Sequence, residues 1–566
     1  MADHTDLTRR TEEWIAGDPD ETTRTELAAL LADGDWEALG ERMDGVLEFG
    51  TAGIRGAVEA GSNRMNRAVV IRTTAGLSNF LLANRSGSVV VGFDGRTSSR
   101  QFAEDTVAVL TAAGHPVSFF PEPVPTPLVA FNARRLGSAA AVVVTASHNP
   151  PADNGYKVYD SNGAQIIPPV DSQIAAAIAA VGAAADVPRS EGSMATTATE
   201  IDPDEVYQAY RAEVEEVRTR HTGSDIAIAY TPIHGVGWRT LDRLFRDADY
   251  KRVRVVESQR DPDGRFPTVS FPNPEEPGAM DLVTALGDRI DADLVIANDP
   301  DADRLAVALP EEDGTWRPLT GNQVGVLVAD WLLEHWESET RPIVINSIVS
   351  SPMLAAVAEA YGARFEQTLT GFKWIANAAM DLEAAGEGRF CCGYEEALGY
   401  SVGRIVRDKD GMSAALVFAD MAATLLDAGS DVKERLDDLY RRVGFWVSTQ
   451  LSLVRPGSEG LAEIDDAMAG LADEVPESLN GLKVTAATDY GEGAEERPRW
   501  LAATPLVALD LSGGGRVLVR PSGTEPKLKI YVDLPGDIGS DPVAAEAVLL
   551  AEAGSIAKEA AQFIGL

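Results

Sequence analysis

Residues 142–159 read VVVTASHNPPADNGYKVY, an apolar β-branched run that ends in a small polar loop. The run predicts a buried strand, and the loop places Ser147 and His148 just beyond its end, with Lys157 ten residues after the serine. Similar runs recur along the chain, each followed by a helical pattern, as in GSVVVGFDGR with SRQFAEDTVAVLTAAG. This alternation predicts parallel sheets covered by helices, and ligands bind at the strand ends of such folds.

Composition limits the class of protein before any motif is interpreted. The 566 residues are 45% apolar and 24% charged, which is typical of a globular protein. A chain of this length is expected to form roughly three to five domains. The net charge of −39 argues against nucleic acid or an anionic membrane as a partner, since both require a basic surface.

Cysteine usage and hydropathy bear on the cellular compartment. Cys391 and Cys392 are adjacent and are the only cysteines, which is typical of a chain kept in a reducing compartment. The first residues, MADHTDLTRRTEEW, lack the apolar segment of a secretory signal, and the most apolar run, IAAAIAAVGAAA, is shorter than a membrane span. The sequence therefore predicts a cytoplasmic protein without a membrane partner.

Shifts in pattern predict the domain organisation. Amphipathic stretches over residues 8–48 predict two or three short helices ahead of the first sheet, and polar segments near 186–203 and 310–322 predict boundaries. After about residue 440 the alternation of strands and helices weakens, which favours a smaller α+β domain. We expect four regions: an N-terminal helical extension with a first α/β domain at 1–205, a second at 206–320, a third at 321–440, and a C-terminal α+β domain at 441–566.

The segment DLVIANDPDADR places three carboxylates at the end of a predicted buried strand. Carboxylates at this spacing repel one another, and hard oxygen ligands suit Mg²⁺ or Ca²⁺. The pattern begins like a calcium-binding EF-hand loop, but Arg304 stands in place of its glycine and Pro310 in place of its closing glutamate. We therefore interpret Asp299, Asp301 and Asp303 as metal ligands rather than as a solvated acidic turn.

Ser147 lacks the surroundings of a hydrolase nucleophile. A Ser-His-Asp hydrolase would need the turn G-x-S-x-G, and here Thr145 and Asn149 stand where its glycines belong. A serine beside a divalent ion could instead pass or hold a phosphoryl group. From the residues alone this interpretation is balanced against an ordinary capped turn.

A third segment, RPSGTEPKLKIY, combines a tight turn with two hydroxyls and a guanidinium, which suit a phosphate dianion. The turn by itself is only suggestive, but the distribution of lysine supports it. Of nine lysines in the chain, Lys157, Lys373, Lys409 and Lys527 lie in or beside candidate loops. A protein of net charge −39 needs such local cations to hold an anionic substrate, so we expect a phosphorylated ligand.

Other common nucleotide and metal motifs are missing from the sequence. It contains no Walker G-x-x-x-x-G-K-[ST], and HGVGWRT does not complete G-x-G-x-x-G. The six histidines include no pair at a zinc-binding spacing. Neither a P-loop kinase, a dinucleotide-binding enzyme nor a zinc hydrolase is supported.

Five motifs, TASHNP, DPDADR, TGFKW, YEEALGY and RPSGTEP, occur in an order and at intervals that resemble the α-D-phosphohexomutase superfamily, in particular its long phosphoglucomutase and phosphopentomutase branch. The resemblance extends from FGTAGIRG at residue 49 to the C-terminus. It implies three similar α/β domains with mixed sheets and a smaller C-terminal α+β domain around a central cleft. It also implies an intramolecular phosphotransferase that acts on small sugar phosphates, binds one Mg²⁺ and is activated by glucose 1,6-bisphosphate. The sequence leaves the oligomeric state open between a monomer and a dimer.

The resemblance also implies roles for individual residues. Ser147 corresponds to the serine that carries a phosphoryl group, and one of that group's oxygens would join Asp299, Asp301 and Asp303 around Mg²⁺. Candidates for general acid and base work beside the transferring phosphate are Arg55, Lys157 and Lys409, and the phosphate would be steadied by Arg304, with His148 mainly shaping the loop. The sugar and its second phosphate would be bound by Thr370, Gly371, Lys373, Glu395, Arg520, Ser522, Gly523 and Thr524.

Two departures bear on the identity of the sugar. Many relatives have Glu-Glu-Ser or Glu-Met-Ser where this chain has Glu395, Glu396 and Ala397, and some have a histidine where Tyr400 stands here. The leading interpretation is a phosphoglucomutase that interconverts glucose 1-phosphate and glucose 6-phosphate. The alternatives are a phosphopentomutase, a mixed phosphohexomutase that includes phosphomannomutase activity, a sugar bisphosphate synthase and a non-catalytic phosphosugar-binding protein.

Overall fold

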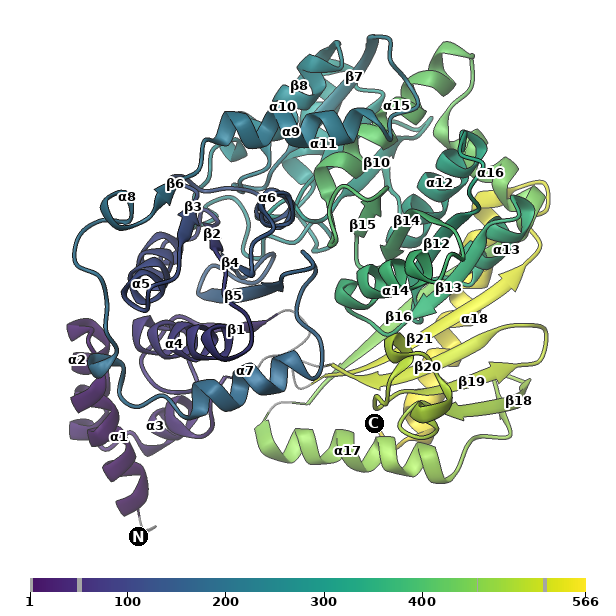
Figure 1. Ribbon diagram of the computed structural model, residues 1–566. Coiled ribbons are helices and arrows are strands. Elements are labelled where there is room, and N and C mark those ends of the chain that lie inside the picture. The colour runs from purple at the N-terminus through teal and green to yellow at the C-terminus, as the bar shows by residue number, and fades with distance from the viewer. Residues whose placement is uncertain (1–3, 48–52, 456, 523–526) are drawn as a thin grey trace. The chain divides into compact units, whose positions relative to one another are not determined.

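The computed structural model describes residues 4–47, 53–455, 457–522 and 527–566 (Figure 1). The described residues form four β-sheets with helices packed against them. By their contacts they divide into two compact units, which we call the first unit (1–318 with 404–419) and the second unit (319–403 with 420–566).

The first sheet of the first unit has six strands in the order β1-β5-β4-β2-β3-β6. Its strands are β1 (Ile54–Ala57), β2 (Val89–Phe93), β3 (Val117–Phe119), β4 (Ala140–Val144), β5 (Asp153–Asp160) and β6 (Thr199–Glu200). β2 pairs in parallel with β3 and β4, whereas β5 runs antiparallel to β4 and β1. β4 is the strand that the sequence predicts before Ser147, and all five of its residues are buried.

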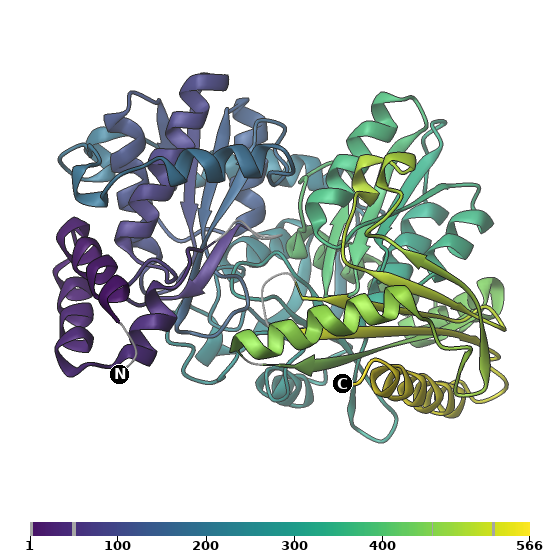
Figure 2. The ribbon, with the colours of Figure 1, turned by 90° about the horizontal axis from the view of Figure 1, so that it is seen from below.

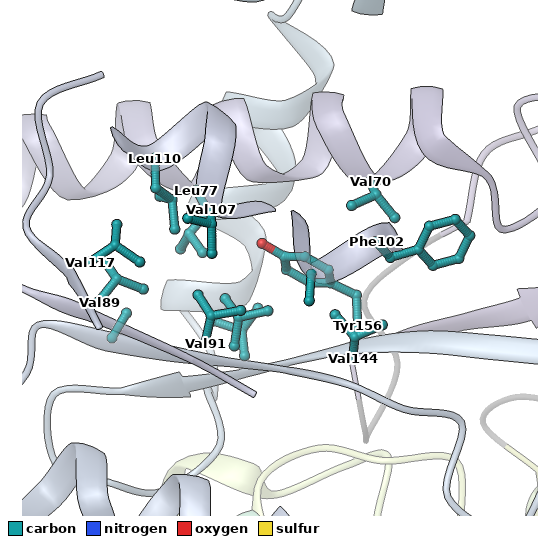
Figure 3. Close-up of a cluster of buried hydrophobic side chains, with 14 of the residues drawn as sticks. Val70, Leu77, Val89, Val91, Phe102, Val107, Leu110, Val117, Val144 and Tyr156 are labelled. Carbon is teal, nitrogen blue, oxygen red and sulfur yellow. The ribbon is translucent and has the colours of Figure 1, made fainter. Parts of the chain in front are cut away.

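Helices on this sheet build the largest described core. They are α4 (Arg67–Asn84), α5 (Ser99–Ala112), α6 (Thr126–Leu136), α7 (Val170–Ala179) and α8 (Met194–Thr197). Figure 3 shows Val70, Leu77, Phe102, Val107 and Leu110 of α4 and α5 facing side chains of the sheet. Each Å² of apolar surface that is buried contributes about 25 cal/mol to stability, so this layer is a main source of stability for the first unit.

Three N-terminal helices precede the first sheet, where the sequence predicts two or three. They are α1 (Thr5–Gly17), α2 (Glu21–Asp33) and α3 (Trp36–Met43). Leu27, Leu39, Met43 and Ala60 form a small buried cluster among them, against which Trp14 packs. Figure 2 shows the three helices gathered at the N-terminal end of the first unit.

The second sheet of the first unit carries the acidic segment. Its strand order is β11-β10-β9-β7-β8, with β7 (Ser224–Thr231), β8 (Tyr250–Val255), β9 (Leu294–Ala297), β10 (Ala306–Pro310) and β11 (Trp316–Pro318). β7 pairs in parallel with β8 and β9, and β10 is antiparallel to β9. The helices are α9 (Pro203–Glu215), α10 (Trp238–Asp247) and α11 (Asp281–Ile290), and the start of α15 (Gly411–Asp427) also belongs to this unit.

The second unit contains a mixed sheet and an antiparallel sheet. The mixed sheet has the order β13-β12-β14-β15, with β12 (Pro342–Ser347), β13 (Arg364–Thr368), β14 (Arg389–Glu395) and β15 (Gly399–Val402). The antiparallel sheet comprises β16 (Phe445–Val454), β17 (Ser478–Leu479), β18 (Leu482–Asp489), β19 (Val507–Leu511), β20 (Arg516–Pro521) and β21 (Lys527–Gly536). The helices are α12 (Gly321–Glu334), α13 (Met353–Ala360), α14 (Phe372–Ala384), α16 (Val432–Val443), α17 (Gly457–Asp473) and α18 (Pro542–Phe563).

The predicted fold class is confirmed: three mixed α/β sheets are followed by a C-terminal α+β arrangement. The strand–helix alternation predicts parallel pairing, and each α/β sheet adds antiparallel strands at an edge. The boundaries expected at 205, 320 and 440 stay predictions; helices α9 and α16 run across the first and the last of them. Residues 404–419, expected in the third domain, belong to the first unit.

Two further sequence features can be located. Cys391 and Cys392 lie in β14 as buried free thiols. No single helix among the described residues is long and apolar enough to span a membrane, and α15 with α16 reaches that length and composition only as a pair bent by 96°.

A close helix crossing in the first unit generates a stability prediction. A Cβ added to Gly76 of α4 would lie 2.6 Å from the Ile178 Cα of α7, so Gly76→Ala should lower the free energy of unfolding by about 1–3 kcal/mol. Gly554→Ala on α18 is the matched control, because its added Cβ meets nothing within 4 Å and alanine favours a helix by about 1 kcal/mol. Thermal unfolding of both variants checks this, and an unchanged melting temperature for Gly76→Ala would contradict it.

Candidate active site

The loop after β4 holds Ser147 in a conformation that few side chains adopt. Its φ is 52°, in the left-handed region. For a residue other than glycine this backbone conformation costs free energy, so it is kept only where the surrounding structure imposes it. The Thr145 hydroxyl accepts a hydrogen bond from the Ser147 N–H (2.8 Å) and donates to Asp94 Oδ2 (2.7 Å). Asp94 directly follows β2, so the neighbouring strand end supports the serine loop.

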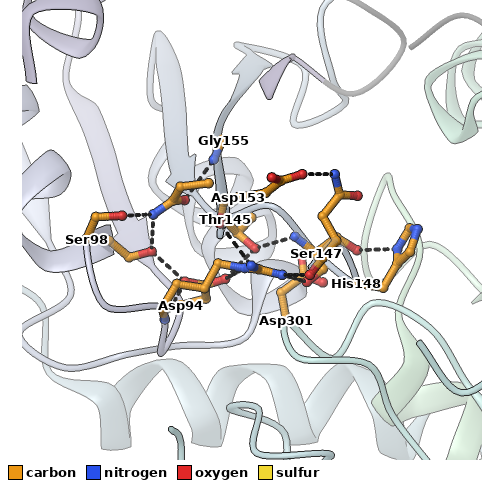
Figure 4. Close-up of polar contacts among 12 residues, drawn as sticks. Asp94, Ser98, Thr145, Ser147, His148, Asp153, Gly155 and Asp301 are labelled. Carbon is orange, nitrogen blue, oxygen red and sulfur yellow. Dashed lines mark hydrogen bonds and ion pairs between the residues drawn. The ribbon is translucent and has the colours of Figure 1, made fainter. Parts of the chain in front are cut away.

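Arg96 holds the same loop through hydrogen bonds to its backbone. Figure 4 shows Ser147 of this loop close to Thr145 and His148. Its guanidinium donates to four carbonyl oxygens, those of Ser147 (2.8 Å), Asn149 (2.5 Å), Pro150 (2.7 Å) and Asp153 (2.9 Å). The Arg96 side chain is 1% exposed and has the buried Asp94 carboxylate 3.4 Å away. Because the guanidinium is planar, buried and bonded to four carbonyl oxygens, it fixes the backbone at Ser147 and after it.

Asp299, Asp301 and Asp303 follow β9, and all three are fully buried. One carboxylate oxygen from each lies within 4.8 Å of those of the other two. The Ser147 hydroxyl donates to Asp299 Oδ2 at 2.8 Å. The serine loop and the acidic loop, 152 residues apart in the chain, therefore meet at one place.

The acidic cluster fits a divalent cation. Asp301 Oδ1 and Asp303 Oδ1 are buried and have no hydrogen-bond partner among the described residues, which leaves two hard oxygen ligands available. Burial and the repulsion of Asp301 and Asp303 raise the pKa of Asp299 well above its usual range. A bound cation would offset both effects.

Two lysines contact the same cluster. The Lys157 ammonium on β5 lies 2.7 Å from Asp301 Oδ2 and 3.0 Å from Asp303 Oδ2. Lys409, just before α15, lies 3.2 Å from Asp303 Oδ2 and 3.3 Å from Asp408 Oδ1. Burial would lower the pKa of Lys157, but the carboxylates outweigh burial and raise it, so this lysine stays a cation.

The remaining first-unit candidates surround the serine more loosely. His148 Nδ1 lies 3.1 Å from Ser147 Oγ, and burial with the nearby Arg304 and Arg55 charges keeps the pKa of His148 well below its usual value. Arg55 donates to Asn149 Oδ1 at 2.6 Å, next to the serine. The Arg304 backbone N–H donates to Asp299 Oδ1, while its guanidinium lies 3.7 Å from Glu275. His148 is thus a neutral hydrogen-bonding group.

The sugar-binding candidates lie in the second unit, at the ends of β13, β14 and β20. The Gly371 N–H donates to Glu395 Oε1 at 2.7 Å, and the Arg520 guanidinium donates to the Thr370 hydroxyl at 2.9 Å. Glu396 accepts from two serines, Ser347 and Ser350, both at 3.1 Å. The contacts of Gly371 and Thr370 join the loop at residues 370–371 to the ends of β14 and β20.

The remaining residues of this set lie on α14, at the end of β20 or outside the described residues. Lys373 is buried on α14 with its ammonium 5.7 Å from the centre of the Trp374 ring. The Ser522 N–H donates to the Lys527 carbonyl at 2.7 Å. Gly523 and Thr524 lie outside the described residues.

Sequence reasoning missed several residues that hold the site together. Asp94 and Arg96 carry a signal that could have been used, because they directly follow a predicted strand, as Ser147 does. Thr126 donates its hydroxyl to Asp301 Oδ2 at 2.7 Å, and Asp408 contacts Lys409. Neither Thr126 nor Asp408 stands in a recognisable motif of its own, so only the tertiary fold reveals them.

Comparison with family models covers most of the chain. Models described as "Phosphoglucomutase/phosphomannomutase, alpha/beta/alpha domain" I, II and III match residues 46–184, 205–313 and 320–443, and the model of the C-terminal domain matches 482–538. Each model falls on a different one of the four sheets. The order of the models is the order of the sheets along the chain.

Individual relatives agree with this pattern. A protein of Haemophilus influenzae named "Probable phosphomannomutase" is 39% identical over 86% of this chain and 95% of its own length. The phosphopentomutase of Mus musculus is 34% identical over 95% of this chain and 92% of its own. Parafusin, a phosphoglucomutase of Paramecium, has a crystal structure with a TM-score of 0.67 at 19% identity, covering 92% of this chain and 96% of its own, so it supports the fold.

Four matched domains and a serine that donates to a buried carboxylate cluster define a class of enzyme, the phosphosugar mutases. The chain belongs to the phosphoglucomutase/phosphomannomutase family. It is accordingly an isomerase that works by intramolecular phosphoryl transfer.

The four hydrogen bonds of Arg96 lead to a prediction about the rate of catalysis. The Arg96→Lys substitution keeps the positive charge, but a lysine cannot donate to all four carbonyl oxygens, so the serine loop should relax. A displacement of Ser147 by about 1 Å can lower the rate about 100-fold, and we expect mutase kcat to fall by that factor. Arg100→Lys is the control, because exposed Arg100 donates to one carbonyl, that of Pro121, and lies over a Phe93 ring. Steady-state kinetics of both variants provide the measurement, and parent-like kcat for Arg96→Lys would refute the role.

Proposed function

We propose that the chain interconverts glucose 1-phosphate and glucose 6-phosphate through a phosphorylated Ser147 and a glucose 1,6-bisphosphate intermediate. One observation carries the proposal: Ser147 Oγ lies 2.8 Å from Asp299 Oδ2, beside a buried three-carboxylate cluster that two lysines contact. A serine in this setting can carry a phosphoryl group, because the nearby cations offset the charge of the group.

The proposed reaction consists of two phosphoryl transfers. Phosphorylated Ser147 gives its phosphoryl group to the free hydroxyl of the sugar monophosphate; the bond between phosphorus and Ser147 Oγ breaks, and a bond to the sugar oxygen forms. The bisphosphate then reorients, and its other phosphoryl group returns to Ser147 Oγ. Each half is the reverse of the other, so a single set of residues serves both.

Basic residues of the first unit would assist each transfer. We assign Arg55, Lys157 and Lys409 to the transferring phosphate, where their positive charges offset its negative charge and the protonated lysines can act as general acids toward the oxygen that leaves phosphorus. Arg304 would steady the same phosphate. His148, kept neutral by burial and adjacent cations, would hold the Ser147 hydroxyl in place.

We propose Mg²⁺ as the cofactor, held by Asp299, Asp301 and Asp303 and by an oxygen of phosphorylated Ser147. The two buried oxygens without a hydrogen-bond partner, Asp301 Oδ1 and Asp303 Oδ1, support this assignment. The ion supplies positive charge that stabilises the transferring phosphoryl group. Glucose 1,6-bisphosphate would act as an activator by phosphorylating Ser147.

The second unit would hold the sugar and the phosphate that does not react. Glu395 offers a carboxylate for two adjacent sugar hydroxyls, and Thr370, Gly371 and Lys373 would read the orientation of the sugar. Arg520 and Ser522, with Gly523 and Thr524 beyond the described residues, would bind the second phosphate.

A phosphopentomutase is the second candidate. It is favoured by the mouse phosphopentomutase, which is 34% identical over 95% of this chain. Ala397 stands where many relatives carry a serine, so the hydroxyl contact to the sugar that is expected from that serine is missing. The phosphomannomutase alternative is favoured by the Haemophilus influenzae relative.

The three sugars can be separated by one comparison. With Mg²⁺ and the matching bisphosphate present, kcat/KM for glucose 1-phosphate should exceed that for ribose 1-phosphate and mannose 1-phosphate by at least tenfold, which corresponds to about 1.4 kcal/mol. Coupled assays of the three substrates, with Ser147→Ala as the inactive control, provide the measurement. A preference for the pentose would make the chain a phosphopentomutase, and turnover only with another phosphoryl donor would make it a bisphosphate synthase.

The metal assignment has a test that does not depend on turnover. Mg²⁺ binds only the folded cluster, so adding MgCl₂ should raise the melting temperature of the parent, and Asp301→Asn should abolish most of that increase. KCl at matched ionic strength controls for screening of the net charge of −39. Equal stabilisation of parent and variant by Mg²⁺ would contradict the assignment.

A further inference from the structure

A fully buried carboxylate lies behind Lys409. Asp408 Oδ2 accepts hydrogen bonds from the Tyr159 hydroxyl at 2.6 Å and from Gln165 Nε2 at 2.8 Å. Its other oxygen, Oδ1, accepts from the Lys409 backbone N–H at 2.7 Å and lies 3.3 Å from the Lys409 ammonium. Tyr159 and Gln165 are themselves buried, at 0% and 6% exposure.

Strand β5 connects this group to the acidic cluster. Residues two apart in a strand point to the same face, so Lys157 and Tyr159 of β5 lie on one side of the sheet. Lys157 contacts Asp301 and Asp303 directly, while Tyr159 reaches Lys409 through Asp408. Gln165 lies opposite Tyr159 in an isolated antiparallel bridge, which places both donors on the same carboxylate oxygen.

We propose that Tyr159 and Gln165 are positioning residues that set the place of the Lys409 ammonium through the Asp408 carboxylate. The inference rests on the proposed function, in which Lys409 acts on the transferring phosphate. Two donors on Oδ2 fix the plane of the carboxylate and thereby direct Oδ1 at Lys409. The lysine side chain has four rotatable bonds, so the contacts at Asp408 and Asp303 restrict its position.

The hydrogen bond from Tyr159 to Asp408 is not needed to hold the backbone of the segment around Lys409. The segment around Lys409 is held independently by Arg134, which donates to the Ile405 carbonyl at 3.0 Å, and by Arg407, which donates to the Asn162 carbonyl at 2.5 Å. Tyr210 adds a third anchor by donating to Asp410 Oδ2 at 2.6 Å. The Tyr159 and Gln165 contacts are thus directed at the Asp408 side chain.

The test is a double-mutant cycle between Tyr159→Phe and Lys409→Met. Tyr159→Phe should lower kcat about 10- to 100-fold, with KM changed less than threefold, because the sugar-binding residues are untouched. In the Lys409→Met background, Tyr159→Phe should change kcat less than twofold. Gln165→Leu, which removes the other donor, should behave in the same way and keeps the test available if Tyr159→Phe does not fold.

Tyr156→Phe is the matched control. Tyr156 lies on the same strand with its hydroxyl 2.9 Å from the Thr74 hydroxyl, in the core of the first sheet (Figure 3). Its loss removes one buried hydrogen bond without touching Asp408, so it should lower the melting temperature but leave kcat within twofold. Additive effects of Tyr159→Phe and Lys409→Met, or equal effects of Tyr156→Phe and Tyr159→Phe, would overturn the proposal.

Failure of the proposed function can be told apart from failure of this inference. If the parent turns over none of the three sugar phosphates, the proposed function has failed. Crystal structures of the parent and Tyr159→Phe then decide the inference: the Lys409 ammonium should leave Asp303 Oδ2 in the variant. An ammonium that keeps its contact of about 3 Å in the variant would overturn the positioning role.

Discussion

Mutual repulsion among three buried carboxylates is the constraint on which the first unit depends. Asp299, Asp301 and Asp303 are held together away from water, where unpaired charges are costly. The Ser147 hydroxyl, Thr126 and two lysines, which come from separate elements of the first unit, offset that cost. Asp301 Oδ1 and Asp303 Oδ1 have no hydrogen-bond partner among the described residues, which leaves both oxygens available to the cation that we propose.

The net charge of −39 makes local cations decisive. The phosphorylated sugar that we propose as the substrate would be repelled by this net charge, so its binding would depend on basic groups placed within a few ångströms. The residues that we propose for phosphoryl transfer lie in the first compact unit, and the described residues that we propose for the sugar and its second phosphate lie in the second. Residues 404–419 belong to the first unit, which brings Lys409 to the acidic cluster.

Sequence patterns predicted the elements of the site better than the links between them. Apolar runs marked β4 and β9, and the polar residues that end them, Ser147 and Asp299, meet at 2.8 Å. Strand–helix alternation predicts only the parallel pairs, and the antiparallel edge strands agree with the mixed sheets that the family resemblance implies. Asp408 was missed because a buried carboxylate is explained only by its partners, which come from distant positions in the chain.

In the proposed reaction, Ser147 carries the phosphoryl group between the two transfers. The direct test is to incubate the purified chain with Mg²⁺ and glucose 1,6-bisphosphate, digest it and locate phosphate by mass spectrometry. We expect one phosphoryl group on the peptide that contains Ser147, and we expect excess glucose 1-phosphate to remove it. Turnover with an unphosphorylated Ser147, or with phosphate on another residue, would contradict it.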